Sequence, residues 1–265
     1  FLVVGLNPTL QNTYFFPSVE LGQVNRAGRH RLDVAGKGVN TARILGQLGE
    51  RAVTITQGGG RHLALYRDLC REDDVELRFV ESEGDIRHCH TLIDERERTT
   101  TEIVEAGAPV TGGTEHSVLE LFRELLPGAH TVIIGGSKAP GYSDSLYPVM
   151  VNDARKAGTR VVLDVRGDDL LGCIPHGPSV IKVNVSEFSQ TFDRDAALPE
   201  DVANGQINSI APKPATPVHS IGCGDAMTAG VAAGLQRGNS LEDAVKLGME
   251  CARRNLRQEK PGTIR

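Results

Sequence analysis

The stretch TVIIGGSKAPGYSDSLYPVMVNDARKAGTRVVLDV, residues 131–165, decides the fold class of this chain. Its first apolar run at 131–136 predicts a buried strand, and the pattern over 144–157 predicts a helix. A second apolar run at 160–165 predicts the next strand. A strand, a helix and a strand in this order are typical of a βα unit with parallel strands. The sequence therefore predicts an α/β fold, and the run SVIKVN at 179–184 adds one more strand.

Polar side chains stand at the ends of these strands, namely Ser137, Asp164 and Asn184. Parallel strands of an open α/β sheet bring their carboxyl ends to one edge, and ligands bind in the crevice outside that edge. We therefore expect the chemistry of this protein at that edge, where clusters of glycine also occur in the sequence.

The region upstream has a different pattern. Strand-like runs at 86–93 and 99–104 flank the charged turn DERER, which is typical of a hairpin. Together with short strands at 12–16 and 29–34, the hairpin predicts a small antiparallel sheet that projects as a lid over a ligand. Covering helices are predicted at 38–48, 61–72, 115–126, 225–236 and 240–256.

Length, charge and cysteine usage restrict the class of protein. The 265 residues suit one large α/β domain, because single cores rarely grow past about 250–300 residues. A net charge of −5 argues against a nucleic-acid partner. No apolar run of about 18 residues occurs, so we expect no membrane partner. The five cysteines are odd in number and form no CxxC pair, which predicts free thiols and a cytoplasmic protein.

The first glycine motif is AGKGVN at 35–40, which opens a predicted helix. Small residues let the backbone approach a ligand, amide N–H groups at a helix start can bind an anion or hydroxyl oxygens, and Asn40 adds a side-chain amide. The alternative is a glycine turn that serves only to pack the helix. The motif fits neither GxGxxG, because Thr41 stands at the third glycine position, nor GxxxxGK[ST], which weakens both dinucleotide-binding and P-loop interpretations.

The second glycine motif is SIGCGDAMTAG at 220–230. Consecutive amides of Gly222, Cys223 and Gly224 at a helix N-terminus can stabilise a phosphoryl group in transfer. Asp225 then stands in the first helical turn, where a carboxylate either caps the helix or accepts a proton from a substrate hydroxyl. Gly222 and Gly224 flank Cys223, the one side chain just before Asp225, and so leave room for a substrate hydroxyl. An aspartate that accepts the proton of this hydroxyl next to a phosphoryl-binding loop is typical of a kinase.

The two motifs together resemble the signatures of the PfkB family of ribokinase-like carbohydrate kinases. AGKGVNTARILGQLG at 35–49 is similar to the first signature and IGCGDAMTAG at 221–230 to the second, and the resemblance covers nearly the whole chain. It implies one kinase domain over 1–265. The implied fold is a three-layer α/β/α sandwich with a mostly parallel central sheet and a small antiparallel lid, to which about 7–34 and 84–107 contribute strands.

Shorter segments resemble the branch of the family that contains 1-phosphofructokinase and tagatose-6-phosphate kinase. They are LNPTLQ (6–11), VNR (24–26), GSKAPG (136–141), LDVRG (163–167), IKVNVSEF (181–188) and PGT (261–263). The resemblance implies transfer of the γ-phosphoryl group of ATP to an already phosphorylated ketohexose.

On the nucleotide side, the resemblance implies that Asp225 deprotonates the acceptor hydroxyl and that the amides of the second motif form an anion hole. Asn184 and Glu187 correspond to an NxxE element associated with Mg²⁺ and its water shell. The alternative for Glu187 is a charge that only stabilises the first turn of a helix. Lys182 precedes Asn184 by two residues on the same strand, so it faces the same side and can meet the nucleotide phosphates.

On the sugar side, the resemblance implies two sets of contacts. The positions expected to hold sugar hydroxyls are Asn7, Gly36, Lys37, Gly38 and Asn40. Arg26, Lys37 and Arg87 are the candidates for the phosphate already on the sugar, with Ser137 near a phosphate as well. A guanidinium on a lid strand can clamp phosphate with two hydrogen bonds, although lone surface arginines are usually only solvated.

Three features depart from the family pattern. Gln11 stands where the opening motif usually has an aspartate that holds sugar hydroxyls, which puts the identity of the sugar in doubt. The interval from Asn184 to Gly222 is short, so either the sequence lacks residues there or the nucleotide pocket is reduced, and we favour the former. Cys223 replaces a small alanine, and at a helix N-terminus we expect a lowered thiol pKa.

These observations predict an ATP- and Mg²⁺-dependent kinase that converts tagatose 6-phosphate or fructose 1-phosphate to the bisphosphate. One alternative is a kinase of an unphosphorylated sugar or nucleoside with the same fold. Another is a catalytically silent sensor of sugar phosphates, which Gln11 and the short nucleotide region favour. The sequence does not fix the oligomeric state, but a lid sheet often offers an edge for pairing, which allows a homodimer through the lid.

Overall fold

The central layer of this computed structural model, which describes residues 1–192 and 218–265, is a six-stranded sheet. Its strands are β1 (Leu2–Val4), β4 (Val53–Gly59), β5 (Glu76–Asp85), β8 (Thr131–Gly135), β9 (Arg160–Asp164) and β10 (Val180–Ile181). They lie in the order β10-β9-β8-β1-β4-β5, and every neighbouring pair is parallel. The predicted α/β class with a mostly parallel central sheet is therefore confirmed.

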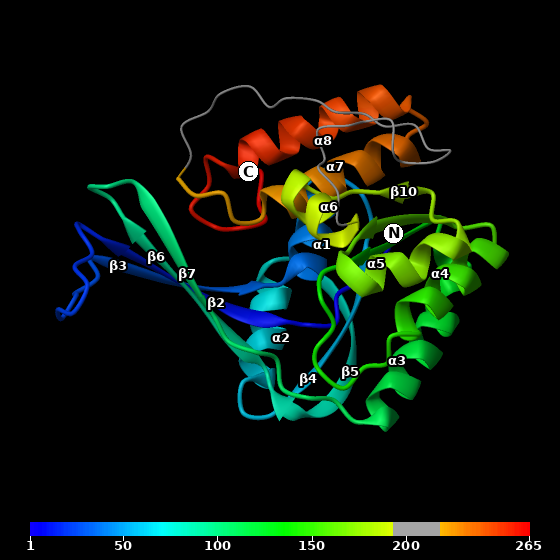
Figure 1. Cartoon of the computed structure of the whole chain (residues 1–265), viewed down its shortest axis with the longest axis horizontal. Helices are drawn as coiled ribbons and strands as arrows, with labels where there is room; N and C mark the ends of the chain where they lie inside the picture. Colours follow the sequence, from blue (N-terminus) through cyan, green and yellow to red (C-terminus); the bar gives the residue numbers. More distant parts are fainter. Residues whose placement is uncertain (193–217) are drawn as a thin grey trace.

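Helices cover both faces of this sheet because its inner strands are apolar on both sides. Leu2 and Val4 pack in one core and Val3 in the other, as the two-residue repeat of a strand requires. The first core is covered by α3 (Gly112–Leu125), α4 (Leu146–Lys156) and α5 (Gly167–Cys173), and the second by α1 (Lys37–Gln47), α2 (Leu63–Glu72), α7 (Cys223–Gln236) and α8 (Leu241–Asn255). Figure 1 shows the resulting three layers.

A second sheet projects from this body, at the left of Figure 1. It consists of β2 (Thr9–Phe16), β3 (Arg29–Ala35), β6 (Arg87–Asp94) and β7 (Thr99–Val104), in the order β3-β2-β6-β7. The predicted hairpin is β6–β7, and β2 pairs with β3 antiparallel as expected. However, β2 and β6 pair in parallel, so the lid is a mixed sheet and the prediction of an antiparallel lid was wrong. The reason is that two antiparallel hairpins join side by side with β2 and β6 running in the same direction.

Several boundaries also differ from those predicted. Strand β2 begins at Thr9 rather than at residue 12, and β10 covers only two residues of the expected run at 179–184. The short helix α6 (Val185–Phe192) follows β10. The unusual interval before Gly222 falls largely on residues 193–217, outside the described residues.

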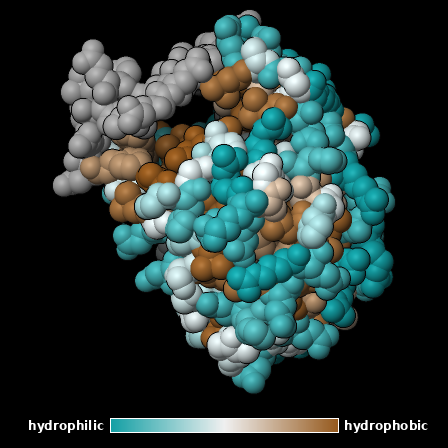
Figure 2. All heavy atoms as spheres, turned by 90° about the vertical axis from the view of Figure 1, so that its right-hand side faces the viewer, coloured by the Kyte–Doolittle hydropathy of each residue, from teal (hydrophilic) through white to brown (hydrophobic). Residues whose placement is uncertain are grey.

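Much of the outer surface is polar. Figure 2 shows the side of the molecule that carries α3 and α4, where hydrophilic residues dominate and hydrophobic ones are scattered among them. Within residues 1–192 and 218–265, no helix combines the length and apolar character needed to cross a bilayer.

Candidate active site

The two glycine motifs meet at the carboxyl edge of the central sheet. They begin α1 and α7, and the side chains of Asn40 and Asp225 join across this junction, because the Asn40 Nδ2 group donates to Asp225 Oδ2 at 2.7 Å. The two residues are 185 positions apart in the sequence and both are buried. Tertiary structure therefore places the expected base in direct contact with the first motif.

Close backbone packing explains the glycines of the first motif. Gly36 has a φ of +111°, a region that L side chains rarely adopt. A Cβ on Gly38 would lie 2.8 Å from the Cα of Gly5, the residue after β1. The start of α1 can lie this close to the sheet only because both positions lack a side chain. Gly38 therefore serves the packing of α1, which also brings Lys37 and Asn40 to the sheet edge. Gly38 lines a pocket as well, so its predicted contact with a ligand stays a prediction.

The loop before α7 is held from behind by the last residues of the chain. Gly222 has a φ of +81°, and a Cβ there would lie 2.3 Å from the backbone nitrogen of Gly262. Asn255 donates from Nδ2 to the carbonyl of Ile221 at 2.8 Å and accepts at Oδ1 from the amide of Thr263 at 3.1 Å. One buried side chain therefore fixes both the glycine loop and the terminal turn.

The amides of this loop are only partly free. The amide of Cys223 donates to the carbonyl of Ser220 at 3.2 Å, which leaves those of Gly222 and Gly224 as the open part of the expected anion hole. No side chain of the described residues caps α7, and the Asp225 side chain contacts Asn40. Asp225 also stands in the first turn of α7, so a charge that stabilises this helix stays the alternative to the proton acceptor.

Two lysines share one buried carboxylate beside this loop. Asp164, at the end of β9, accepts from Lys37 Nζ at 2.8 Å and from Lys182 Nζ at 3.3 Å. Thr228 Oγ1 donates to the other carboxylate oxygen at 2.8 Å. Burial acts to raise the pKa of Asp164, but the two lysines outweigh it, so the pKa is lowered and the carboxylate is charged. A Cβ on Gly224 would lie 2.9 Å from Lys182 Nζ, which places this ammonium group at the anion hole.

The pKa of Asp225 is shifted in the opposite direction. Burial is the main cause that raises it to about 6, and the charge of Asp164 adds to the effect, while Asn40, Lys37 and Lys182 oppose it. A carboxyl group with this pKa is deprotonated at neutral pH and is a better proton acceptor than an ordinary aspartate. Such a value is typical of a general base.

We expect the pH dependence of kcat/KM to report this group, because the carboxylate form is the one that accepts a proton. Activity should rise with pH through a midpoint near 6 and fall about tenfold per unit below it. Phosphate monoesters also titrate near pH 6. The control is therefore the ¹³C NMR titration of the Asp225 carboxyl, with Asp225→Asn used to assign its signal, and a carboxyl midpoint near 4 would contradict the expectation.

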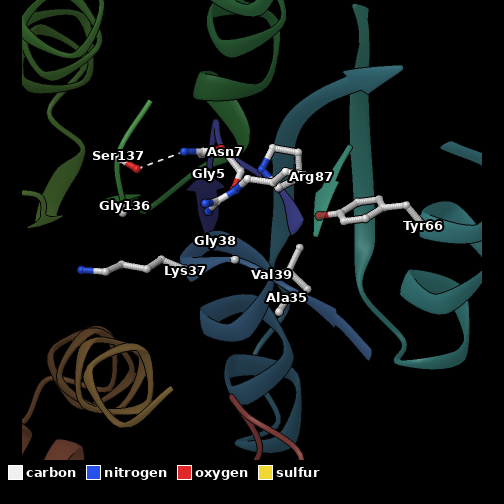
Figure 3. A pocket seen from close by; sticks show the side chains of 13 residues that line it. Gly5, Asn7, Ala35, Lys37, Gly38, Val39, Tyr66, Arg87, Gly136 and Ser137 are labelled. Atoms are coloured by element: carbon white, nitrogen blue, oxygen red, sulfur yellow. Dashed lines mark hydrogen bonds between the residues drawn. The ribbon is translucent and has the colours of Figure 1, made fainter. Parts of the chain in front are cut away.

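A pocket of about 170 Å³ lies beneath the lid. Of the predicted sugar contacts, its lining contains Asn7, Gly36, Lys37, Gly38, Arg87 and Ser137 (Figure 3). Asn7 Nδ2 donates to Ser137 Oγ at 3.1 Å, which ties the residue before the lid to the end of β8. The pocket therefore gathers most of the sugar-side predictions between the lid and the body.

Arg87 enters this pocket from the first residue of β6. Its terminal nitrogens donate to the carbonyls of Glu105 at 3.0 Å and Asn7 at 3.4 Å. Its Nε atom is buried and has no hydrogen-bond partner among the described residues. Because an unpaired buried donor is costly, this guanidinium is suited to an anionic ligand.

Three predicted contacts are not brought to the same place. Figure 3 shows the Lys37 side chain extended away from Arg87, in agreement with its ion pair to Asp164. Arg26 lies exposed in the loop between β2 and β3. Gln11 lies outside the pocket lining, and its Nε2 donates to Thr91 Oγ1 at 2.8 Å. The three cations expected at the sugar phosphate are thus separated. Lys37 and Arg87 both line the pocket, but the Lys37 ammonium group is paired with Asp164, and Arg26 lies outside the lining.

Asn184 and Glu187 form a reciprocal cap at the start of α6. The amide of Glu187 donates to Asn184 Oδ1 at 2.8 Å, and the amide of Asn184 donates to Glu187 Oε2 at 3.0 Å. The second oxygen, Oε1, lies 3.8 Å from Lys37 Nζ. Glu187 therefore stabilises its helix and also presents one oxygen toward the site, so the two interpretations are compatible.

The expectation for Cys223 was wrong in direction. Burial raises the pKa of this thiol, and the charge of Asp225 adds to the effect although Asn255 lowers it. Cys223, the first residue of α7, is thus a protonated thiol.

Some residues that support the site belong to no motif that the sequence analysis identified. Thr228 lies three residues after Asp225, so it shares a helix face with it, and this spacing could have been noticed. Asn255 and Arg43 support the site from a distance, through hydrogen bonds to carbonyls and amides of remote segments. No local pattern predicts such contacts.

A family model described as "pfkB family carbohydrate kinase" matches residues 8–206 and 193–264 of this chain. The chain belongs to this family. As a PfkB carbohydrate kinase it is a phosphotransferase with an alcohol group as acceptor, and kinases of this family use ATP and a divalent metal ion. The resemblance drawn from the two glycine motifs is confirmed.

Solved structures share its fold at low sequence identity. Phosphofructokinase-2 from Escherichia coli in complex with fructose-6-phosphate is 22% identical, with 96% of this chain and 92% of that chain covered and a TM-score of 0.85. A possible 1-phosphofructokinase from Thermotoga maritima is 23% identical, with 98% and 92% covered and a TM-score of 0.87. Ribokinase from Arabidopsis thaliana is 18% identical, with 98% and 94% covered and a TM-score of 0.73.

Proposed function

We propose that this PfkB kinase transfers the γ-phosphoryl group of ATP to a ketohexose phosphate, with tagatose 6-phosphate or fructose 1-phosphate as acceptor and the bisphosphate as product. The single observation that carries the proposal is the position of Asp225. Its buried carboxylate lies between the amide loop of α7 and Asn40 of the sugar-side motif. A group at this junction can contact both an acceptor hydroxyl and the phosphoryl group in transfer.

The proposed step is an in-line displacement. Asp225 accepts the proton of the acceptor hydroxyl as its oxygen bonds to the γ-phosphorus, and the bond to the oxygen bridging to the β-phosphate breaks, so that ADP leaves. The amides of Gly222 and Gly224, with Cys223 between them, face the charge on the γ-phosphoryl oxygens. Lys182 adds a positive charge beside Gly224.

We propose that Asn184 and Glu187 hold Mg²⁺ through its water shell. Mg²⁺ usually keeps several waters and binds through one or two carboxylates and substrate phosphates. Oε1 of Glu187 fits this requirement, because only the other oxygen is used in the helix cap and Oε1 has Lys37 Nζ at 3.8 Å. When bound, the ion would neutralise charge on the nucleotide phosphates.

The lid, the assembly and the compartment complete the proposal. Closure of the lid would exclude water from the pocket and limit hydrolysis of ATP.

The outer strand β7 is exposed along its whole length, which favours pairing of two copies through the lid. A related structure is titled a tetrameric inhibited form of phosphofructokinase-2. The five cysteines are free thiols, which suits the cytoplasm.

A substrate panel tests the function. The purified protein is assayed with ATP, Mg²⁺ and tagatose 6-phosphate, fructose 1-phosphate, fructose 6-phosphate or fructose. Turnover restricted to the phosphorylated sugars supports the proposal, whereas preference for fructose contradicts it.

Gln11 favours a second candidate, a silent sugar-phosphate sensor, because its neutral amide donates to Thr91. Calorimetric binding of a sugar phosphate with no turnover of ATP would support that candidate.

We expect Arg87→Met to raise KM for the sugar phosphate at least about tenfold and to leave KM for ATP within about twofold. The reason is that the unpartnered Arg87 Nε lines the pocket beneath the lid. Arg96→Met is the matched control and should behave as wild type, because Arg96 is an exposed lid arginine whose side chain pairs with Glu97. An unchanged KM for the sugar phosphate in Arg87→Met would remove Arg87 from the binding site.

A further inference from the structure

Arg43 lies beneath the active site and does not contact the pocket. It follows Asn40 by three residues in α1, so both side chains are on the same helix face. Its side chain is 3% exposed. A guanidinium so deeply buried is rare unless it is fully paired, and its partners therefore show what holds it.

All three nitrogens of this guanidinium have partners. Nε donates to Asp73 Oδ2 at 2.9 Å, and Nη2 contacts the same carboxylate at 2.8 Å and the carbonyl of Val34 at 2.6 Å. Nη1 donates to Asn40 Oδ1 at 3.1 Å and to the carbonyls of Pro261 and Gly262 at 3.1 and 3.2 Å. Arg43 thus joins the lid strand β3, the terminal turn and the end of α2 to one active-site amide.

The contact with Asn40 determines which way its amide faces. An asparagine amide has an oxygen that accepts and a nitrogen that donates, whereas a guanidinium only donates. Arg43 therefore holds the oxygen of Asn40, and the nitrogen is left to donate to Asp225 Oδ2 at 2.7 Å. The reversed amide would oppose an oxygen to the carboxylate of Asp225 and nitrogen hydrogens to the guanidinium.

The terminal turn closes the remaining space around Asn40. Gly262 has a φ of +65°, and a Cβ there would lie 2.5 Å from Asn40 Cγ. The carbonyl of the same glycine accepts from Arg43. Asn40 is therefore confined by packing on one side and by the guanidinium on the other.

We propose that Arg43 is a positioning residue for the phosphoryl transfer, which orients the Asn40 amide so that it donates to Asp225 and keeps that carboxylate aimed at the acceptor hydroxyl. The inference rests on the proposed function only where kcat is measured, because the NMR midpoint of Asp225 needs no turnover. The ionisable groups near Asp225 are Lys37 on α1, Asp164 on β9 and Lys182 after β10, with Glu187 beyond Lys37, and Cys223 on its own helix α7. None of them contacts Asn40 as Arg43 does.

The decisive variant is Arg43→Lys, which keeps the charge. An ammonium group has three donors in place of five, and Asp73 is the strongest acceptor in reach, so the bond to Asn40 is the one we expect to be lost. The hydrogen bond from Asn40 acts to lower the pKa of Asp225. Without Arg43 to hold its oxygen, the Asn40 amide no longer keeps its nitrogen on Asp225, and this second hydrogen bond is lost as well. The ¹³C NMR midpoint of the Asp225 carboxyl should therefore rise by at least about 0.5 unit, and kcat should fall about tenfold with KM changed little.

Asp73→Asn is the matched control, because it weakens the far side of the guanidinium and leaves the bond to Asn40 in place. We expect it to lower the melting temperature without moving the Asp225 midpoint. An equal shift of the midpoint in both variants would mean that Arg43 is merely structural. If Arg43→Lys does not fold, Arg43→Met replaces it, because a thioether has no N–H donor for Asn40, and we expect the Asp225 midpoint to rise in the same way.

A double-mutant cycle separates action through Asn40 from action by another route. We expect Arg43→Lys to lower kcat less than about twofold when it is added to Asn40→Ala, although it lowers kcat about tenfold alone. Multiplicative losses would overturn the proposal. The NMR midpoint does not need turnover, so a protein that phosphorylates no sugar in the panel still gives a result for Arg43, and the two proposals fail separately.

Discussion

Asp225→Asn lowers kcat by at least about 10²-fold and leaves the affinity for ATP within about threefold, measured at saturating sugar phosphate and by calorimetry with nucleotide. The amide keeps the size of the side chain but cannot accept the hydroxyl proton. It also removes the charge that accepts the hydrogen bond from Asn40 at 2.7 Å. Because a buried carboxylate is replaced by a neutral group, the variant should be at least as stable to heat as the parent.

Asp243→Asn supplies the control for a first-turn aspartate. Asp243 stands in the first turn of α8 and contacts the capping residue Ser240, so its contribution is limited to the start of that helix. We expect kcat of this variant to match the parent. If Asp225→Asn were as active as Asp243→Asn, Asp225 would be a helix-stabilising charge and no base.

Gly222→Ala should abolish most activity and destabilise the fold. A Cβ here would lie 2.3 Å from the backbone nitrogen of Gly262 and 3.2 Å from Asn255 Oδ1, so either the amide loop or the terminal turn must move. Overpacking of this kind costs about 1–3 kcal/mol, in addition to the strain of a positive φ. Displaced amide donors typically lower kcat about 10²- to 10³-fold. Thermal unfolding and steady-state kinetics measure the two effects.

Gly238→Ala at the other end of the same helix separates strain from packing. Gly238 has a φ of +80°, almost that of Gly222, but a Cβ there meets nothing within 4 Å. We expect it to cost about 1 kcal/mol of stability with kcat unchanged. Equal kinetic losses in the two variants would show that close packing against Gly262 does not hold the anion hole.

The fold class and the family were predictable because their signals are local. Buried parallel strands are continuous apolar runs, as in the segment at 131–136, and each glycine motif lies within one turn and the helix after it. The direction of the lid strands was less predictable. Pairing between β2 and β6 joins segments about 78 residues apart, and alternation along a strand is the same in parallel and antiparallel pairs.

The sequence by itself determined the α/β architecture, the carboxyl edge of the candidate site and the choice of Asp225 as the candidate base, because these depend on short patterns of apolar residues and glycines. Only the tertiary structure decided which charges meet. It paired Lys37 with Asp164 and placed Arg87 in the pocket beneath the lid, and it placed Arg43 behind Asn40. Ion pairs and buried hydrogen bonds depend on distances of a few ångströms between remote segments, and such distances exist only once the chain is packed.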